Sequence, residues 1–346
     1  MDFELNCPLP MRHDTIQLAH GGGGRIMREL LEKVMLPAFH NPALDARHDA
    51  ALLDLGGVRV AFTTDTYVVK PRFFPGGNIG KLAVYGTVND LAMGGAVPKW
   101  LSVGMVLEEG YPVEELRQVV EAMRAAAAEC GVAIVTGDTK VVDRGKGDGV
   151  FINTAGIGVV PGGVDIGPHR VEPGDAVLVS GDVGRHGIAV MSVREGLAFE
   201  TPIESDCAPV HGLAAALLEG GVDVHCMRDP TRGGLASVLN EIATDASVGI
   251  EAVEADIPVQ EGVAGACEML GLDPLYVACE GRMVAFVPGA QAERALERLR
   301  SAKGGEGAAR IGTVTGEDRG TVLLRTALGT RRILDLLSGE QLPRIC

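Results

Sequence analysis

The sequence is poor in aromatic side chains and has no long apolar run. Only 4% of its 346 residues are Phe, Trp or Tyr, so it offers few platforms on which nucleic-acid bases could stack. No stretch approaches the roughly 20 apolar residues of a membrane-spanning helix. The N-terminus, MDFELNCPLP, has no basic segment leading into an apolar one. We therefore predict a soluble, cytoplasmic protein with no nucleic-acid or membrane partner.

Paired cysteines are also missing. The seven cysteines include no CxxC pair, and their number is odd, which indicates neither a zinc site nor a complete disulfide framework. Reduced thiols are the simplest expectation. The formal charge of −15 disfavours contact with phosphate polymers and anionic membranes. Any phosphate ligand must therefore be bound locally, by backbone amides, lysines or metal ions.

The alternation of strand-like and helical runs defines the fold class. The chain is long enough for two domains, and the alternation predicts an α/β (α+β) protein with mixed sheets packed against helices. One helix is expected over residues 113–130. Its predicted buried face consists of Leu116, Val119, Val120 and Met123.

A proline- and glycine-rich segment, PGGVDIGPHRVEP, covers residues 161–173 and is typical of a boundary between domains. We expect an N-terminal segment with a glycine-rich loop over residues 1–40 and a first domain over 41–160. A second domain should cover 161–337. A flexible tail, residues 338–346, is then expected to leave the globule.

Four glycines, Gly21, Gly22, Gly23 and Gly24, precede the helical run RIMRELLEKVM. Amides at the N-terminus of a helix bind anions, so this loop is a candidate phosphate cradle. It lacks the lysine and hydroxyl residue of a Walker loop, and it follows no strong strand. A mobile linker is an equally good interpretation.

Aspartates recur among small and apolar residues, at what we predict to be strand ends or turns. They are Asp49, Asp65, Asp90, Asp138 and Asp229. A carboxylate is costly to bury unless it is paired or coordinated, and oxygen-rich clusters suit Mg²⁺ that bridges phosphates. A turn or helix cap is the alternative for any one of them, and Asp229 before Pro230 has the form of an N-cap.

Two further residues are candidates for chemistry. Lys140 follows Asp138 by two residues and is placed to neutralise a phosphate or stabilise an oxyanion; a surface lysine is the alternative. Glu280 lies in YVACEGRMVAFV, which we interpret as an apolar strand. Burial there would raise its pKa toward that of a general base, unless Arg282 pairs with it.

The chain ends in Cys346, after Pro343 has made a continued helix impossible. A thiol at the end of a tail can reach places that a core thiol cannot, which favours a mobile substrate arm. The neighbouring carboxylate raises the pKa of such a thiol, so its nucleophilicity needs a cation such as Arg344 or a partner enzyme. A frayed end without a role is the alternative.

Taken together, several segments resemble the HypE family of hydrogenase maturation factors. They are HGGGGRIMREL, TTDTYVVKPRFFPGGNIGKLAVYGTVNDLAMGGA, TGDTKVV, MRDPTRGGL, ACEGR and the terminal PRIC, and the resemblance runs from about residue 15 to the end. The wider PurM-like ATP-binding superfamily shares only the acidic residues with this chain. That superfamily includes aminoimidazole ribonucleotide synthetase and selenophosphate synthetase. The segments FFPGG and PRIC distinguish the HypE family from the rest of this superfamily.

The resemblance implies a reaction and its partners. The carbamoyltransferase HypF would load a carbamoyl group onto Cys346, and ATP-dependent dehydration would turn the thiocarbamate into a thiocyanate. The cyanide would pass to the iron-carrying HypC-HypD complex, for the iron of a nickel-iron hydrogenase. A homodimer, with nucleotide sites near its interface, is also implied.

The resemblance further implies residue roles. Glu280 would take the amide protons, and Lys140 would stabilise the oxygen as charge develops. Mg²⁺ would be held by Asp49, Asp65, Asp90, Asp138 and Asp229. ATP would be bound by Gly21, Gly22, Gly23, Gly24, Asp65, Thr66, Lys81, Asn89, Asp138 and Thr139. The superfamily often has two adjacent acidic residues where this chain has His48-Asp49.

Two other functions remain open. An ATP-dependent synthetase or kinase acting on a free small molecule would make Cys346 incidental, and deletion of the tail would then leave turnover intact. A delivery module that carries a group made elsewhere would have no use for a general base at Glu280.

Overall fold

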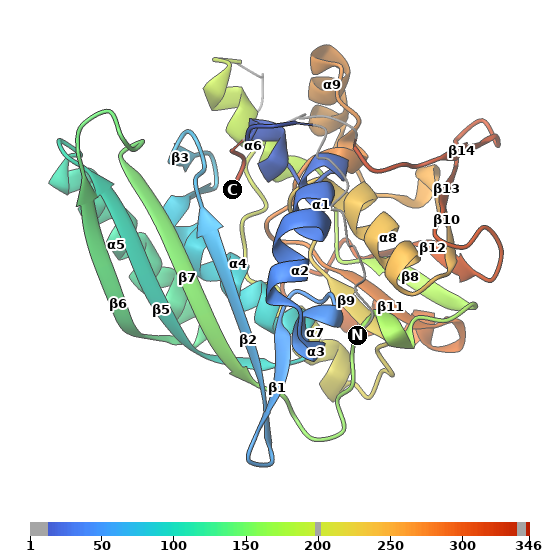
Figure 1. Cartoon of the computed structure of the whole chain (residues 1–346). Coiled ribbons are helices and arrows are strands. Elements are labelled where there is room, and N and C mark those ends of the chain that lie inside the picture. Colours follow the sequence, from blue (N-terminus) through green and yellow to red (C-terminus); the bar gives the residue numbers. More distant parts are fainter. Residues whose placement is uncertain (1–12, 198–201, 338–343) are drawn as a thin grey trace, which may run out of the picture.

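The computed structural model describes residues 13–197, 202–337 and 344–346, and the chain forms two halves, each built on one sheet (Figure 1). The first sheet has the order β1-β2-β7-β5-β6, and only β5 and β6 run parallel. Its strands are β1 (Ala51–Leu55), β2 (Val58–Tyr67), β5 (Val97–Glu108), β6 (Ala133–Val142) and β7 (Val150–Val159). A small hairpin joins β3 (Phe73–Phe74) to β4 (Gly77–Asn78).

The second sheet has the order β14-β13-β10-β12-β8-β11-β9. Its strands are β8 (Asp175–Val179), β9 (Cys226–Arg228), β10 (Gly249–Val253), β11 (Val284–Pro288), β12 (Ala309–Thr315), β13 (Val322–Arg325) and β14 (Arg331–Ile333). The predicted mixed α/β class is thus present in both halves. β7 and β8 flank the predicted boundary segment, although the domain limits themselves stay a prediction.

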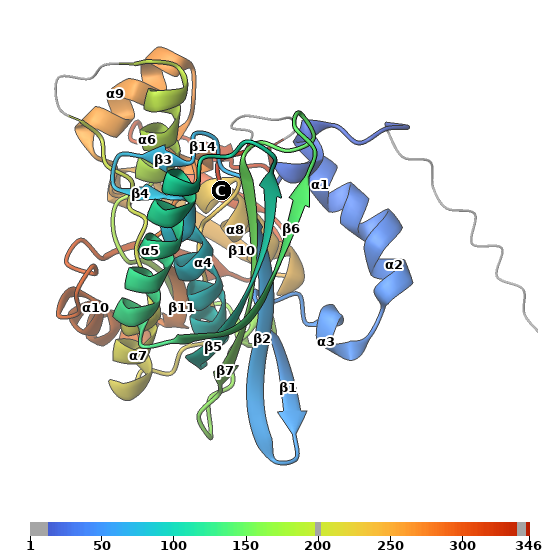
Figure 2. The same cartoon turned by 90° about the vertical axis from the view of Figure 1, so that its left-hand side faces the viewer.

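Helices lie on both sides of the first sheet and also pack on the second. In Figure 2, α4 and α5 lie on one side of the first sheet and the N-terminal helices on the other. The first half contains η1 (Leu18–Gly21), α1 (Arg25–Leu30), a π-helical turn (Leu31–Met35), α2 (Leu36–Phe39), α3 (Pro42–Asp45), α4 (Ile79–Met93) and α5 (Val113–Cys130). The second contains α6 (Arg185–Arg194), α7 (His211–Glu219), α8 (Gly234–Asp245), α9 (Glu261–Leu270) and α10 (Ala292–Arg300), with short 3₁₀ turns at Pro168–Arg170, Glu254–Asp256, Pro274–Tyr276 and Gly289–Gln291. Within the described residues, no helix has the length and apolar character of a bilayer span.

Helix α5 has the predicted limits, because Gly131 in the left-handed conformation (φ 65°) ends it. Val119 and Met123 are buried as expected. The prediction for Val120 was wrong, since this side chain is 46% exposed. It lines an open apolar groove that also includes Ile134 of β6, so α5 does not cover the sheet as far as its edge.

Helix α4 is buried on almost every side and joins the two halves. Leu82 and Val84 belong to the core of the first half, whereas Met93 at its end packs into the core of the second. Asp90 therefore lies in a helix, and the prediction that it ends a strand or occupies a turn was wrong. An apolar helix without a polar face gives no amphipathic period from which to recognise it.

Candidate active site

Three carboxylates from distant parts of the sequence meet at the junction of the halves. Asp49 precedes β1, Asp90 lies on α4 and Asp229 follows β9, and one ligand oxygen of each lies within 4.8 Å of the others. Asp65 of β2 lines the same pocket, which has a volume of about 440 Å³. Asp229 is no N-cap, because α8 begins only after Gly233.

Burial makes this acidic pocket electrostatically unfavourable without a cation. Desolvation, followed by the charges of neighbouring carboxylates, raises the pKa of Asp90 well above its usual value. Burial also raises the pKa of Asp49 well above its usual value, and the positive charge of Arg228 opposes this effect. Arg228 Nε lies 2.7 Å from Asp49 Oδ1. Burial also raises the pKa of Asp229, to about 6.

The donor set of this pocket fits a divalent cation. The second oxygen of Asp49, Oδ2, is buried and has no hydrogen-bond partner among the described residues. Carboxylate oxygens are the ligands that Mg²⁺ prefers, and a cation would offset the repulsion that raises these pKa values. The neighbouring His48 remains neutral, since burial, then Arg228 and His169, lower its pKa to about 3.

The glycine-rich loop closes one side of this pocket. Gly23 and Gly24 line it, and α1 begins at the next residue. Gly23 has φ +75°, and a Cβ there would lie 2.7 Å from the carbonyl oxygen of Arg232. Ser237 donates a hydrogen bond to the Gly23 carbonyl, at 3.2 Å. Only glycine permits this approach to the segment that carries Asp229.

Glu280 is 3% exposed and lies in the loop before β11, so the prediction that it sits within a strand was wrong. Burial raises its pKa, and the charges of Asp229, Asp65 and Asp206 add to this effect, while Arg232 opposes it. Its backbone N–H donates to Asp206 Oδ1 at 3.1 Å. Its Oε1 is buried without a hydrogen-bond partner in the described chain. These are the properties of a strong carboxylate base.

The end of the chain is docked in its own site. Ile345 is buried in the core of the first half, with the partly buried Cys346 beside it. Burial raises the pKa of the Cys346 thiol; Arg232 opposes this, and the charge of Glu280 reinforces it. The expected departure of the tail from the globule is therefore wrong for residues 344–346, and residues 338–343 lie outside the described ranges.

Strand β6 carries its predicted site residues away from this pocket. Thr66, Asn153, Gly104 and Asp138 occupy successive strands in one row of the sheet. Three strand spacings separate Thr66 from Asp138, or about 14 Å. Asp138 and Lys140 are exposed and pair with each other, with Nζ 2.5 Å from Oδ2. Thr139, between them, faces the opposite side of the strand.

Three other predicted nucleotide ligands are not among the residues that line the acidic pocket. Thr66 accepts a hydrogen bond from Asn153. Lys81 lies in the first turn of α4, and its positive charge acts on the Glu129 carboxylate. Asn89 accepts from the backbone N–H of Val210 at 2.8 Å, which ties α4 to the start of α7.

Several residues at the site were not predicted. Arg228 and Arg232 both stand in the quoted segment MRDPTRGGL, so a search for cations that flank a buried carboxylate would have found them. His186 gave no such signal. Its Nε2 lies 2.8 Å from the carbonyl oxygen of Ile345, 159 residues away.

Protonation of His186 should destabilise the fold. Burial lowers its pKa below the usual 6.5, so the neutral ring contributes stability above pH 6.5 that is lost as the pH falls through the folded-state value. Chemical unfolding from pH 7.5 to 5.5 should show wild type losing stability relative to His186→Gln, by up to about 1.4 kcal/mol per pH unit. Parallel pH profiles would contradict this expectation.

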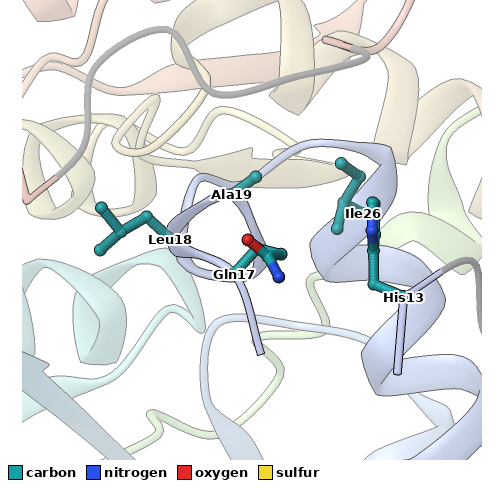
Figure 3. A pocket seen from close by; sticks show the side chains of 5 residues that line it. All are labelled: His13, Gln17, Leu18, Ala19 and Ile26. Carbon is teal, nitrogen blue, oxygen red and sulfur yellow. The ribbon is translucent and has the colours of Figure 1, made fainter. Parts of the chain in front are cut away.

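A second hollow lies beside the glycine-rich loop, with a volume of about 360 Å³. Figure 3 shows its lining side chains, His13, Gln17, Leu18, Ala19 and Ile26. None of them is acidic, and none belongs to the acidic pocket. We therefore assign the chemistry to the junction of the halves.

Comparison with known proteins agrees with this architecture. The family model of the AIR synthase related protein N-terminal domain matches residues 47–160, and that of the C-terminal domain matches residues 172–325. These matches define the class: an AIR synthase-related protein of PurM-like fold. Carbamoyl dehydratase HypE of Azotobacter vinelandii is 52% identical over 98% of this chain and 99% of that protein. HypE of Escherichia coli K12 is 47% identical over 96% of this chain and 100% of that protein.

Solved structures give the same result. A HypE-HypF complex contains a chain with a TM-score of 0.85 and 49% identity, covering 89% of this chain and 99% of that one. A HypE structure in complex with ATP has a TM-score of 0.81 and 49% identity, covering 96% and 100%. The chain belongs to the HypE family of carbamoyl dehydratases. The predictions of family, fold class and enzyme class are thereby confirmed.

Proposed function

We propose that this chain dehydrates a carbamoyl group on its own Cys346 to a thiocyanate at the expense of ATP, and so supplies cyanide for the iron of a nickel-iron hydrogenase. The observation that carries the proposal is the position of the terminal thiol. Cys346 is docked where the charges of Glu280, Asp65 and Asp229 reach it. A carbamoyl group on the sulfur would therefore lie beside both a buried base and the acidic pocket.

The residues divide the reaction between them. Asp49, Asp65, Asp90 and Asp229 would hold Mg²⁺, which neutralises phosphate charge when bound. The carbamoyl oxygen takes the γ-phosphoryl group of substrate ATP and becomes a leaving group, while Glu280 accepts one N–H proton. The nitrile then forms when the C–O bond breaks and the phosphate group leaves with the second N–H proton. Burial of Glu280 excludes water from this step.

Two relatives support the cofactor and one partner. A similar HypE was solved with ATP, and another was solved as a HypE-HypF complex. We propose ATP with Mg²⁺ as cofactors and HypF as the carbamoyl donor. We also propose that the HypC-HypD complex accepts the cyanide and that the reaction takes place in the cytoplasm.

A homodimer explains the exposed side of the first sheet. Phe62, Ile157 and Trp100 lie in one row and are 43%, 39% and 50% exposed. We propose that a second copy covers this face, since such an apolar surface favours association. Asp138 and Lys140 lie on the same face by register, so a dimer would enclose them and let them take part in a shared nucleotide site.

Intact-mass measurement tests the function in two stages. Native chain and Cys346→Ala are first incubated with a carbamoyltransferase and carbamoyl phosphate. They are then separated from these reagents and given ATP or an analogue with a non-hydrolysable β–γ bridge. We expect the native chain alone to gain one carbamoyl group, and to lose one water with ATP but not with the analogue.

Two results would contradict the proposal. A carbamoyl group that never loses water would make the chain a carrier. Equal loading of the native chain and Cys346→Ala would exclude the tail as the substrate. No loading of either would do the same, and that is the expectation for an enzyme that acts on a free small molecule.

A further inference from the structure

Two buried polar groups near Cys346 have no hydrogen-bond partner in the part of the chain that the structure describes. One is an acceptor, the Oε1 atom of Glu280, and the other is a donor, the hydroxyl group of Tyr67. Glu280 is 3% exposed and Tyr67 is 1% exposed, so bulk solvent does not reach either group. Unpaired polar groups at this depth are costly and rare, which indicates that a bound molecule completes them.

Strand β2 brings the Tyr67 hydroxyl against helix α4. Thr63, Asp65 and Tyr67 alternate along the strand and therefore share one of its faces. On this face Thr63 donates a hydrogen bond to Asp90 of α4, with 2.9 Å between Oγ1 and Oδ2. The Tyr67 ring meets the same helix one turn earlier, where a Cβ on Gly86 would collide with the hydroxyl oxygen. The phenol thus ends one helical turn from a residue of the acidic pocket.

The loop that carries Glu280 is tied to the same stretch of α4. Asn89 Nδ2 donates to the Ala208 carbonyl oxygen at 3.2 Å, and the Ala208 N–H donates to the Glu280 carbonyl oxygen at 3.4 Å. Gly86 and Asn89 are three residues apart and are therefore neighbours on the helix surface. Burial, and then the charges of nearby carboxylates that include Glu280, raise the pKa of Tyr67. The unpaired donor and the unpaired acceptor thus belong to one site.

The terminal thiol lies beside both groups. The N–H of Val68, the residue after Tyr67, donates to the Cys346 carbonyl oxygen at 3.0 Å. Cys346 packs against the apolar core that contains Tyr67, and the charge of Glu280 acts on its sulfur. A carbamoyl group on that sulfur has one carbonyl oxygen, which accepts hydrogen bonds, and an amide N–H, which donates them. The substrate therefore supplies the complement of both unpaired groups.

We propose that Tyr67 is a further catalytic residue, whose hydroxyl group donates to the carbamoyl oxygen while Glu280 Oε1 accepts from the carbamoyl N–H. The inference rests on the proposed function, because Cys346 must carry the carbamoyl group. When Glu280 takes the N–H proton, the electron pair left on nitrogen delocalises onto the oxygen. Tyr67 stabilises the charge that develops there and keeps its own proton. The charged oxygen is also the better nucleophile toward the γ-phosphoryl group of ATP.

Isotope-edited infrared spectroscopy tests this hydrogen bond without turnover. Potassium cyanate labelled with ¹³C adds a carbamoyl group to thiols, and subtraction of Cys346→Ala treated in the same way isolates the carbonyl band of the tail. We expect this band to move to higher wavenumber in Tyr67→Phe, because loss of the donor strengthens the C=O bond. Tyr111→Phe is the matched control and should leave the band in place. The Tyr111 hydroxyl is likewise unpaired within the described ranges, and its ring packs against Arg72.

Tyr67→Phe should also slow dehydration of the carbamoylated chain by about 10²–10³-fold, the usual contribution of one oxyanion donor. ATP affinity should be unchanged. The variant keeps the ring that packs against Gly86 and leaves no polar group unpaired, so it should fold at least as stably as wild type. Intact mass follows the loss of water, calorimetry gives the ATP affinity, and thermal unfolding checks the fold.

An unmoved carbonyl band in Tyr67→Phe would overturn the proposal, and so would dehydration at the wild-type rate. Either result would leave Thr87, whose nearby hydroxyl group lowers the pKa of Tyr67, as the partner of the phenol. The infrared experiment needs neither ATP nor a carbamoyltransferase. If the native chain keeps its carbamoyl group and never loses water, the proposed function fails, while the band shift still reports on Tyr67.

Discussion

Glu280→Gln should retain ATP binding and lose dehydration of the carbamoylated tail by about 10²–10⁴-fold, the usual contribution of a positioned base. The amide has the size of the carboxylate but cannot accept a proton. Because burial raises the pKa of Glu280 well above its usual value, the charged form is costly in the fold, and the neutral variant should be at least as stable as wild type. Loss of water from the carbamoylated chain is followed by intact mass, and ATP affinity by calorimetry.

Glu317→Gln, in the exposed turn after β12, is the matched control and should behave as wild type. Undiminished nitrile formation by Glu280→Gln would show that another group takes the protons. A simultaneous loss of ATP affinity would instead place Glu280 among the nucleotide ligands.

Asp90→Asn should lower Mg²⁺-dependent ATP affinity by about two orders of magnitude, because it removes one charged ligand from a cluster of three. Without Mg²⁺ the same change should stabilise the protein. The folded-state pKa of Asp90 lies well above its unfolded value of 3.8, so the stability associated with its protonated form is lost as the pH rises through the folded-state value. At pH 7.5 the charge is a cost that asparagine avoids.

Calorimetric ATP titrations with and without Mg²⁺, together with thermal unfolding of the metal-free protein, measure both effects. Asp256→Asn, an exposed acid outside the pocket, controls for net charge. Unchanged affinity in Asp90→Asn would make Asp90 a structural residue of α4. A loss of stability without metal would show that its hydrogen bond from Thr63, at 2.9 Å, outweighs the repulsion.

Local patterns predicted the elements whose sequence alternates clearly. The helix over 113–130, with Gly131 as its stop, follows from periodicity and a terminal glycine. Asp90 was misplaced because α4 is buried all round, and apolar runs of that kind do not distinguish helix from strand. Glu280 was misplaced for a related reason: VACEGRM is apolar in composition, yet Gly281 lies so close to Asp206 that a Cβ would meet its carbonyl oxygen at 1.8 Å.

The site was predictable as a set of residue types and not as an arrangement. Buried aspartates in small-residue surroundings predicted a cation site, and Asp49, Asp90 and Asp229 do converge. Nothing in the spacing of TGDTKVV shows that β6 lies at the far edge of the sheet, where Asp138 is separated from Asp65. The docking of the tail depends on pairs such as Arg344 and Val68, 276 residues apart, which no local pattern encodes.

The acidic pocket draws its ligands from both halves of the chain, with Asp49 and Asp90 on one side and Asp229 on the other. A single bound cation would therefore add a crosslink between two halves that α4 and the Asp49–Arg228 ion pair already join. Filling the pocket should merge their unfolding into one cooperative transition and slow amide exchange on both sides together. A cation bound to a few carboxylate oxygens would in this way make both halves of the molecule more rigid.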